Sequence, residues 1–308
     1  MNRRQRILKE LRYTIKDFYR EFPNDDVCLE HIKEQRWPNG VTQCFSEHCK
    51  GLPRKHHRVS GRTAYACDHC GHHEFPLAGT IFEKTSTSLR LWFYAMYLMG
   101  STRCGISAKQ IQRETGVTYK TAWRMFKQIR TLMSEEISLE GSTVEMDETY
   151  MGGRSRHGSK RGRAGAGSHK QCVVAKTSEN ASAEKLIGMA KEFIMPESTV
   201  FTDEWTGYSG LGEEAKVFHK RINHAEKVYV MGDVHTQTID GFWSLVKRGI
   251  GGVYHQISKK YMQSYLGEYS FRYNRRDQGN LIFTSILKRV SERASEQPGG
   301  QVAENLPV

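Results

Sequence analysis

The chain has 308 residues, of which 26% are charged and 38% hydrophobic, and this composition is typical of a folded protein with two or three compact units. Lys and Arg outnumber Asp and Glu by 46 to 34, and the formal net charge of +12 suits a polyanionic partner such as nucleic acid. The most apolar segment, 89–100, is too short to span a bilayer and predicts a buried helix, and the charged N-terminus lacks the apolar core of a secretory signal. We therefore expect an intracellular, cytoplasmic protein without a membrane partner.

Residues 1–36 are expected to form a helical N-terminal segment. Cys28 lies there in an apolar rhythm of helical spacing, so we interpret it as a core residue and not as a metal ligand. Cys104 and Cys172 have no partner at metal-ligand spacing, and the simplest interpretation of both is a buried small side chain.

Four further cysteines fall into two pairs within residues 37–85. The pattern is Cys-x4-Cys, a gap of 17 residues and Cys-x2-Cys, formed by Cys44, Cys49, Cys67 and Cys70. Two short knuckles on opposing hairpins can place four thiolates around one structural zinc ion, which offsets the small core of such a unit. The first knuckle is wider than usual, so His48 could replace Cys49, and four unligated thiols are the alternative. The spacing favours a zinc ribbon.

A helix-turn-helix is predicted within residues 86–138. The segment 107–133 offers a short amphipathic helix, a turn at Gly116 and a longer helix that starts at Thr118. The second helix is basic and could enter the major groove of DNA, although helical hairpins of other kinds look similar. The candidates for DNA contact on it are Lys120, Arg124 and Lys127.

Residues 152–170 form a Gly-rich stretch with six Lys or Arg, two His and no acid. This composition is poor for a strand and favours a solvated flexible loop. A mobile basic loop can still neutralise phosphates as it orders on binding, and Arg161 and Arg163 are the candidates for DNA contact within it.

Two aspartates stand where the strand pattern makes them unusual. The alternation over residues 143–153 predicts a strand with Asp147 in its middle, although Asp is depleted in strands. A short β-rich run, 199–202, ends in Asp203. Taken alone, Asp203 could equally belong to a turn or cap a helix.

A third acid, Asp240, stands near the start of the predicted helix TIDGFWSLVK (238–247), where it could be only the polar residue that begins the helix. The three aspartates, separated by 55 and then 36 residues, can instead converge to hold a pair of divalent ions, and Mg²⁺ prefers carboxylate oxygens. Lys247 lies two helical turns after Asp240 on nearly the same face, so it can reach a phosphate beside that site. Arg248 is a further candidate for DNA contact.

Residues 259–276 predict an aromatic-rich amphipathic helix that serves mainly for packing. Its basic end offers weaker candidates for phosphate contact, namely Arg272, Arg275 and Arg276. The last residues, 291–308, predict a disordered tail.

The motifs together resemble those of insertion-sequence transposases that combine an N-terminal zinc ribbon with a catalytic domain of the DDE superfamily, the group allied to the Merlin elements. The resemblance covers nearly the whole chain, and its specific parts are DETYMGG (147–153) and HTQTIDGFWSLVKRG (235–249). The supporting motifs are CLEHIKEQRWPNG (28–40), GTIFEKT (79–85), FTDEWTGY (201–208) and FRYNRR (271–276).

The resemblance implies a multidomain α+β protein: a zinc ribbon, a helix-turn-helix and an RNase H-like (retroviral-integrase-type) α/β catalytic domain over residues 140–290. It makes Asp147, Asp203 and Asp240 the metal-binding catalytic triad and Lys247 the basic residue that accompanies it. The implied cofactors are Mg²⁺ or Mn²⁺ at the catalytic site and structural Zn²⁺. The implied partner is DNA, both of the element ends and of the target. On DNA the protein is expected to be at least a dimer, and its expected location is the nucleoid of a bacterium.

Two features depart from the family pattern. The third acid is commonly Glu or Asn in this group, whereas here it is Asp240, which can still supply a metal oxygen. An RNase H-like domain needs three antiparallel strands before its first helix, yet between Asp147 and the helix predicted at 182–194 we find only one further strand, 170–178. One strand is expected to be missing, or hidden inside the basic loop, and its loss would leave unpaired amides beside Asp147.

We expect a DNA transposase that binds element ends, hydrolyses a phosphodiester bond with the help of metal ions, and then joins the exposed 3′-hydroxyl to target DNA without a covalent enzyme intermediate. Two alternatives stay open. One is a catalytically silent DNA-binding protein derived from a transposase, which a missing strand would favour. The other is a metal-dependent nuclease that cuts without joining ends.

Overall fold

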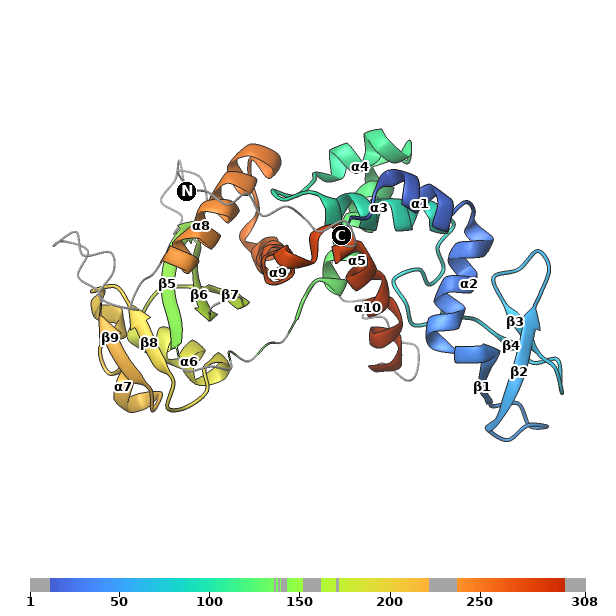
Figure 1. Ribbon diagram of the computed structural model, residues 1–308, viewed down its shortest axis with the longest axis horizontal. Helices are drawn as coiled ribbons and strands as arrows, with labels where there is room; N and C mark the ends of the chain where they lie inside the picture. The colour runs from blue at the N-terminus through green and yellow to red at the C-terminus, as the bar shows by residue number, and fades with distance from the viewer. Residues whose placement is uncertain are drawn as a thin grey trace. The chain divides into compact units, whose positions relative to one another are not determined.

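The computed structural model describes residues 12–135, 137, 139, 143–151, 162–169, 172–221 and 237–296 (Figure 1). The chain divides into two compact units. Unit 1 is assembled from Met1–Ser101, Ala108–Leu132 and Gln278–Val308, and unit 2 from Thr102–Ser107 and Met133–Asp277. The end of the chain therefore returns to unit 1, whereas the sequence predicted a catalytic domain that continues to residue 290. No helix in the described part of the chain is long and apolar enough to cross a membrane.

Two capped helices begin the described part of unit 1. Helix α1 (Ile15–Glu21) follows Thr14, whose side chain forms half of a capping box, and α2 (Asp25–Arg36) is capped by the side chain of Asn24. Cys28 is fully buried on α2, as its apolar spacing predicted.

An antiparallel sheet follows α2. Its strands, in spatial order, are β1 (Val41–Cys44), β2 (Leu52–Arg58), β3 (Tyr65–Cys67) and β4 (His73–Glu74). Each pair of neighbours forms a hairpin, so the ends of β1 and β3 come to the same side of the sheet. This is the arrangement of opposing hairpins that the cysteine spacing predicted.

Three helices complete the N-terminal part of unit 1: α3 (Leu89–Ser101), α4 (Ala108–Thr115) and α5 (Tyr119–Leu132). Helix α3 is the buried helix predicted at 89–100, with Trp92, Phe93 and Met96 almost without exposed surface. Between α4 and α5, Gly116 has φ of +71°, a left-handed conformation that glycine adopts without steric cost. The hydroxyl of Thr118 then accepts from the Thr121 amide at 3.2 Å and caps α5.

The last described helix, α10 (Ile282–Glu296), belongs to unit 1, where it packs against α2, α3 and α5. Phe283 is 1% exposed, and its ring lies 5.8 Å from that of Phe18 and 6.0 Å from those of Phe22 and Tyr97. The helix continues to Glu296, past the start of the tail expected at 291, and the remainder of that tail lies outside the described residues.

Unit 2 is built on a mixed sheet with the strand order β7-β6-β5-β8-β9 among the described residues (Figure 1). The strands are β5 (Thr143–Met151), β6 (Gly162–His169), β7 (Cys172–Ser178), β8 (Thr199–Thr202) and β9 (Phe218–Arg221). Strand β6 runs antiparallel to both β5 and β7, β8 runs parallel to β5, and β9 runs parallel to β8. The central strand is therefore β5, which carries Asp147.

Strand β6 corrects the expectation that one strand is missing. It lies inside the stretch that composition assigned to a solvated loop, and residues 162–168 pair with β5 while 163–169 pair with β7. Strand propensity largely reflects side-chain packing. Strand β6, however, lies between β5 and β7 and is held by backbone hydrogen bonds on both edges, which Gly and Ala form as well as any residue. The alternative of a strand hidden in the basic stretch is the correct one. The rest of that stretch, 152–161 and 170, lies outside the described residues.

Helices cover both faces of this sheet. On one face Val144 and Met146 pack with Leu186 of α6 (Ala183–Phe193). On the other face Val173 packs with Phe242 in a cluster shared by α8 (Gln237–Gly249) and α9 (Met262–Asn274). Side chains alternate along a strand, so the odd-numbered residues of β5 face α8. Shorter elements complete unit 2: 3₁₀ turns at Thr206–Tyr208 and Lys259–Tyr261, helix α7 (Leu211–Glu214) and a π-helical turn at Ile250–Tyr254. A further 3₁₀ turn, Arg276–Leu281, spans the end of unit 2 and leads into α10.

Candidate metal centres and nucleic-acid interface

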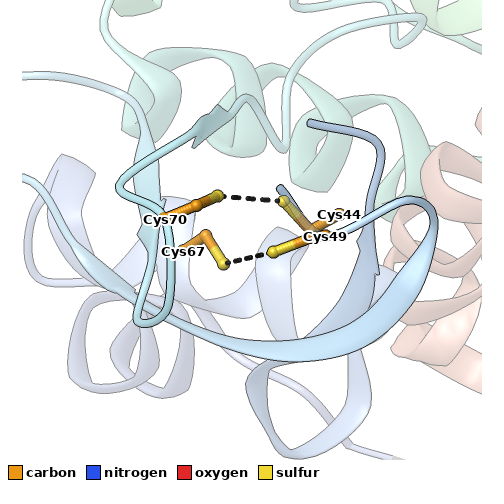
Figure 2. A group of neighbouring side chains, drawn as sticks. All are labelled: Cys44, Cys49, Cys67 and Cys70. Atoms are coloured by element: carbon orange, nitrogen blue, oxygen red, sulfur yellow. Dashed lines mark hydrogen bonds between the residues drawn. The ribbon is translucent and has the colours of Figure 1, made fainter. Parts of the chain in front are cut away.

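Four sulfur atoms converge at one end of the ribbon sheet (Figure 2). The Sγ atom of Cys44 lies 3.5 Å from that of Cys70, the Sγ atom of Cys49 lies 3.9 Å from that of Cys67, and all four lie within 4.8 Å of one another. A tetrahedral zinc ion bound at about 2.3 Å by each thiolate separates its sulfurs by about 3.8 Å, so the group fits zinc. His48 is exposed and is not in this group, which leaves Cys49 as the fourth ligand.

Ser46 is a residue of this centre that the cysteine spacing did not reveal. Its hydroxyl lies 3.0 Å from the Sγ atom of Cys70 and also accepts from the Cys49 amide at 3.3 Å. The hydrogen bond from Ser46 is the largest cause that lowers the pKa of Cys70 to about 6. Ser46 thereby favours the thiolate form that binds zinc.

The three remaining cysteines lie outside the cluster. Cys28 is buried, whereas Cys104 and Cys172 are only half-buried. The interpretation of these last two as buried small side chains is therefore only partly correct.

Asp147 lies on β5, and Asp203 directly follows the neighbouring parallel strand β8. The ladder between β5 and β8 pairs Glu145 with Phe201, and each aspartate lies two residues further along its own chain. Alternation then puts both aspartates on the face of the sheet that Glu145 shares. One oxygen of Asp203 also accepts from the Trp205 amide at 3.0 Å, so the turn that the sequence allowed for Asp203 is present as well.

The charges near Asp147 act on its carboxyl group. Burial is the largest cause that raises the pKa of Asp147 to about 7, and the neighbouring Glu148, Asp240 and Asp203 raise it further. A negative charge so placed is unfavourable unless a cation compensates it. The acids are less tightly gathered than the ribbon sulfurs, because in the described part of the chain only the cysteine group has all its ligand atoms within 4.8 Å.

The first turn of α8 is capped from the sheet. Glu145 is 7% exposed, and its Oε2 atom accepts from the Thr238 and Ile239 amides, each at 3.0 Å. The opening amides of α8 therefore have an acceptor other than Asp240, which lies in the same turn and is exposed. Sequence reasoning missed Glu145 because its partners are 93 and 94 positions away.

One face of α8 is exposed and polar. It carries Asp240, Lys247 and Arg248, while Phe242 on the opposite face and Trp243 at the edge of the polar face are buried. The helix is continuous from Gln237 to Gly249, so Asp240 and Lys247 lie two turns and about 10.5 Å apart along one face. Trp243 is a core residue.

The basic end of α9 serves packing. Arg272 is buried, forms a 2.7 Å ion pair with Glu268 and donates to the Thr102 carbonyl at 2.9 Å. Arg275 pairs with Glu135 at 2.5 Å. Neither guanidinium fits the weaker expectation of phosphate contact, because both are engaged within unit 2.

The second helix of the α4–α5 pair exposes Lys120 and Arg124, whereas Lys127 is half-buried. Exposed cations on one helix provide the kind of surface that contacts phosphates. Arg161 lies outside the described residues, and for Arg163 only the backbone, in β6, is described.

Known protein families match a part of each unit of the chain. Residues 138–274 match the family described as the ISXO2-like transposase domain, and residues 23–73 match the transposase zinc-ribbon domain. A protein of the transposable element ISH50 from Halobacterium salinarum is 30% identical over 267 residues, which cover 78% of this chain and 88% of that protein. A transposase-like protein from Haemophilus influenzae is 29% identical over 111 residues, covering 36% of this chain and 86% of that protein.

The chain is thus similar to transposases in both its ribbon and its larger sheet unit. It belongs to the family of insertion-sequence transposases that carry an N-terminal zinc ribbon. The ribbon match and the cluster of four cysteines together indicate a structural zinc ion.

Proposed function

We propose that the protein is an active DNA transposase of the DDE type, with unit 2 as an RNase H-like catalytic domain. The observation that carries the proposal is the convergence of acids from three elements. Asp147 lies on the central strand, Asp203 just after the adjacent parallel strand, and Asp240 on α8. The charges of Asp203 and Asp240 both raise the pKa of Asp147. Three antiparallel strands followed by parallel ones support the same fold.

The donor set suits Mg²⁺ or Mn²⁺. Hard carboxylate oxygens are the preferred protein ligands of these ions, and a divalent cation would stabilise the ionised form of Asp147, whose pKa is raised first by burial and then by the neighbouring acids. Asp147, Asp203 and Asp240 would hold the ions. When bound, the ions activate the attacking oxygen and stabilise the leaving oxygen of an in-line displacement at phosphorus.

The chain's own residues bind and orient the DNA. Lys247 and Arg248, on the exposed face of α8 that also carries Asp240, attract the phosphates that flank the scissile bond. Since water and then the 3′-hydroxyl act as nucleophiles, hydrolysis and strand transfer need no side chain to form a covalent bond to DNA. Joining two element ends to one target requires at least two protomers on DNA.

Unit 1 is the proposed reader of the element ends. Helices α4 and α5, joined at Gly116, support a helix-turn-helix whose second helix presents Lys120 and Arg124. The zinc ribbon adds a second small module for DNA contact. Both would hold the ends while unit 2 cuts them.

The proposal is tested with purified protein, Mg²⁺ or Mn²⁺, and DNA that carries the terminal repeats of its own element. Wild type is expected to cut at the repeat ends and to join them to a target plasmid. Asp147→Asn and Asp203→Asn are expected to abolish both steps, whereas Asp277→Asn, an exposed aspartate of unit 2, keeps them. Tight DNA binding without cleavage under either ion would support the silent DNA-binding protein, and cleavage without joining would support the nuclease.

A further inference from the structure

We propose that Glu145 is a positioning residue of the catalytic site, which fixes the first turn of α8 and thereby the place of the Asp240 carboxylate beside Asp147. The inference rests on the proposed function, because the role of Asp240 as a metal ligand belongs to that proposal. Glu145 itself touches neither metal nor DNA in this assignment and acts through the helix it caps.

The contact is a helix cap supplied by a distant strand. The opening amides of a helix have no acceptor within the helix, and a carboxylate placed there also interacts favourably with the helix dipole. Glu145 fulfils both conditions with its two 3.0 Å hydrogen bonds from Thr238 and Ile239. A second tie holds the same turn, since the Tyr273 hydroxyl donates to the Thr238 carbonyl at 3.4 Å.

Burial makes the partners depend on one another. The carboxylate of a residue as buried as Glu145 has lost most of its hydration, and only hydrogen bonds and positive charge can replace that hydration. The amides and the positive end of α8 supply them. Without Glu145 these amides would lose a charged acceptor, and the first turn would keep the long hydrogen bond from Tyr273 and the apolar contact of Ile239 with the core.

The two elements that this cap joins are those that carry Asp147 and Asp240. Glu145 and Asp147 are two residues apart on β5 and share one face of the sheet. Thr238 and Asp240 belong to the same first turn of α8. Joining Glu145 to Thr238 therefore fixes the distance between the strand and the turn that carry Asp147 and Asp240.

Two measurements on the full chain test the assignment, with Glu145→Ala and Glu145→Gln as variants and Glu184→Ala as matched control. Glu184 is an exposed glutamate in the first turn of α6. Hydrogen exchange followed by mass spectrometry is expected to show at least tenfold faster exchange of the Thr238 and Ile239 amides in Glu145→Ala. Glu145→Gln keeps an acceptor oxygen and is expected to lie between Glu145→Ala and wild type, which also shows that the fold survives.

The second measurement is Mn²⁺ binding, followed by electron paramagnetic resonance of the free ion. Loss of a group that orients a metal ligand typically weakens metal binding by about 10–100-fold, and we expect this for Glu145→Ala. In an Asp240→Asn background the same substitution is expected to weaken binding by less than about threefold, because residues that act as one unit are not additive.

Unchanged exchange at Thr238 and Ile239 in Glu145→Ala would overturn the assignment, and so would a full loss of Mn²⁺ affinity that persists in the Asp240→Asn background. Failure of the proposed function looks different. If wild type binds no Mn²⁺ and cuts no DNA, the catalytic proposal fails, while the exchange rates still decide whether Glu145 orders the first turn of α8.

Discussion

The hydroxyl of Tyr208 donates a 2.5 Å hydrogen bond to the carboxylate of Glu148, the residue that follows Asp147 on β5. Tyr208 has no exposed surface and belongs to the core on the α6 face of the sheet. The contact fixes Glu148 on that face, while Asp147 belongs to the other. The adjacent acids Asp147 and Glu148 therefore lie on opposite faces of the sheet, because side chains alternate along a strand.

Tyr208→Phe is expected to lower the free energy of unfolding of unit 2. The substitution leaves a carboxylate oxygen without its buried donor, and a lost hydrogen bond to a charged group costs roughly 1.5–3 kcal/mol. Denaturant unfolding at neutral pH measures the change. Tyr119→Phe, which removes an exposed hydroxyl, should stay within about 0.5 kcal/mol of wild type. A Tyr208→Phe protein as stable as wild type would contradict the importance of the contact.

Asp147→Asn is expected to stabilise the metal-free protein above pH 7. The pKa of Asp147 is about 7 in the folded chain against an ordinary value of 3.8, so the folded state holds this proton more tightly than the unfolded state and loses stability as pH rises between these values. Asn cannot ionise and avoids this loss. The difference in unfolding free energy should grow from near zero at pH 4 to an upper limit of about 4 kcal/mol above pH 7.

Unfolding curves between pH 4 and pH 8, in buffer without Mg²⁺ or Mn²⁺, measure this difference, with Asp277→Asn as the control that shows no such trend. Added Mg²⁺ is expected to reverse the order, because it stabilises only the wild type. If the difference in unfolding free energy between Asp147→Asn and wild type did not change with pH, the ionised form of Asp147 would not be unfavourable in the folded chain.

Loss of one ribbon cysteine is expected to remove the zinc ion. Elemental analysis should find about one zinc per chain in wild type and in Cys172→Ser, and none in Cys67→Ser, because a closed structural site needs its full ligand set. Ser46→Ala is expected to retain zinc at neutral pH but to release it at a higher pH than wild type does on acidification, since the Cys70 thiolate loses its hydrogen bond. Full zinc occupancy in Cys67→Ser would show that the cluster does not hold the metal.

Exposed cations on α5 are expected to contribute to DNA affinity through phosphates. A Lys120→Ala, Arg124→Ala protein should bind element-end DNA more weakly and lower the slope of log affinity against log salt by about 2. Fluorescence anisotropy between 50 and 200 mM salt provides the slope. Lys185→Ala, which removes an exposed cation on α6, is the control. An unchanged slope in the double variant would place DNA contact elsewhere.

Local patterns were readable in the sequence, and pairings between distant segments were not. The ribbon cysteines follow from spacing within a few residues, Asp147 stood out because it interrupts a strand pattern, and Asp203 because it ends one. Strand β6 was hidden because its backbone pairs hold it while its composition argues against a strand. The cap of α8 by Glu145 was equally invisible, since a helix start shows which amides need an acceptor but not which distant side chain supplies it.

The return of α10 to unit 1 also fixes an order of events during synthesis. All the residues of unit 2 leave the ribosome before Phe283 does, and Phe283 is the ring on which Phe18, Phe22 and Tyr97 converge. Unit 2 can therefore be completely synthesised while unit 1 still lacks α10, a helix of its core. A protein truncated before α10 would therefore lose core contacts of α1 and α3, near the other end of the described chain.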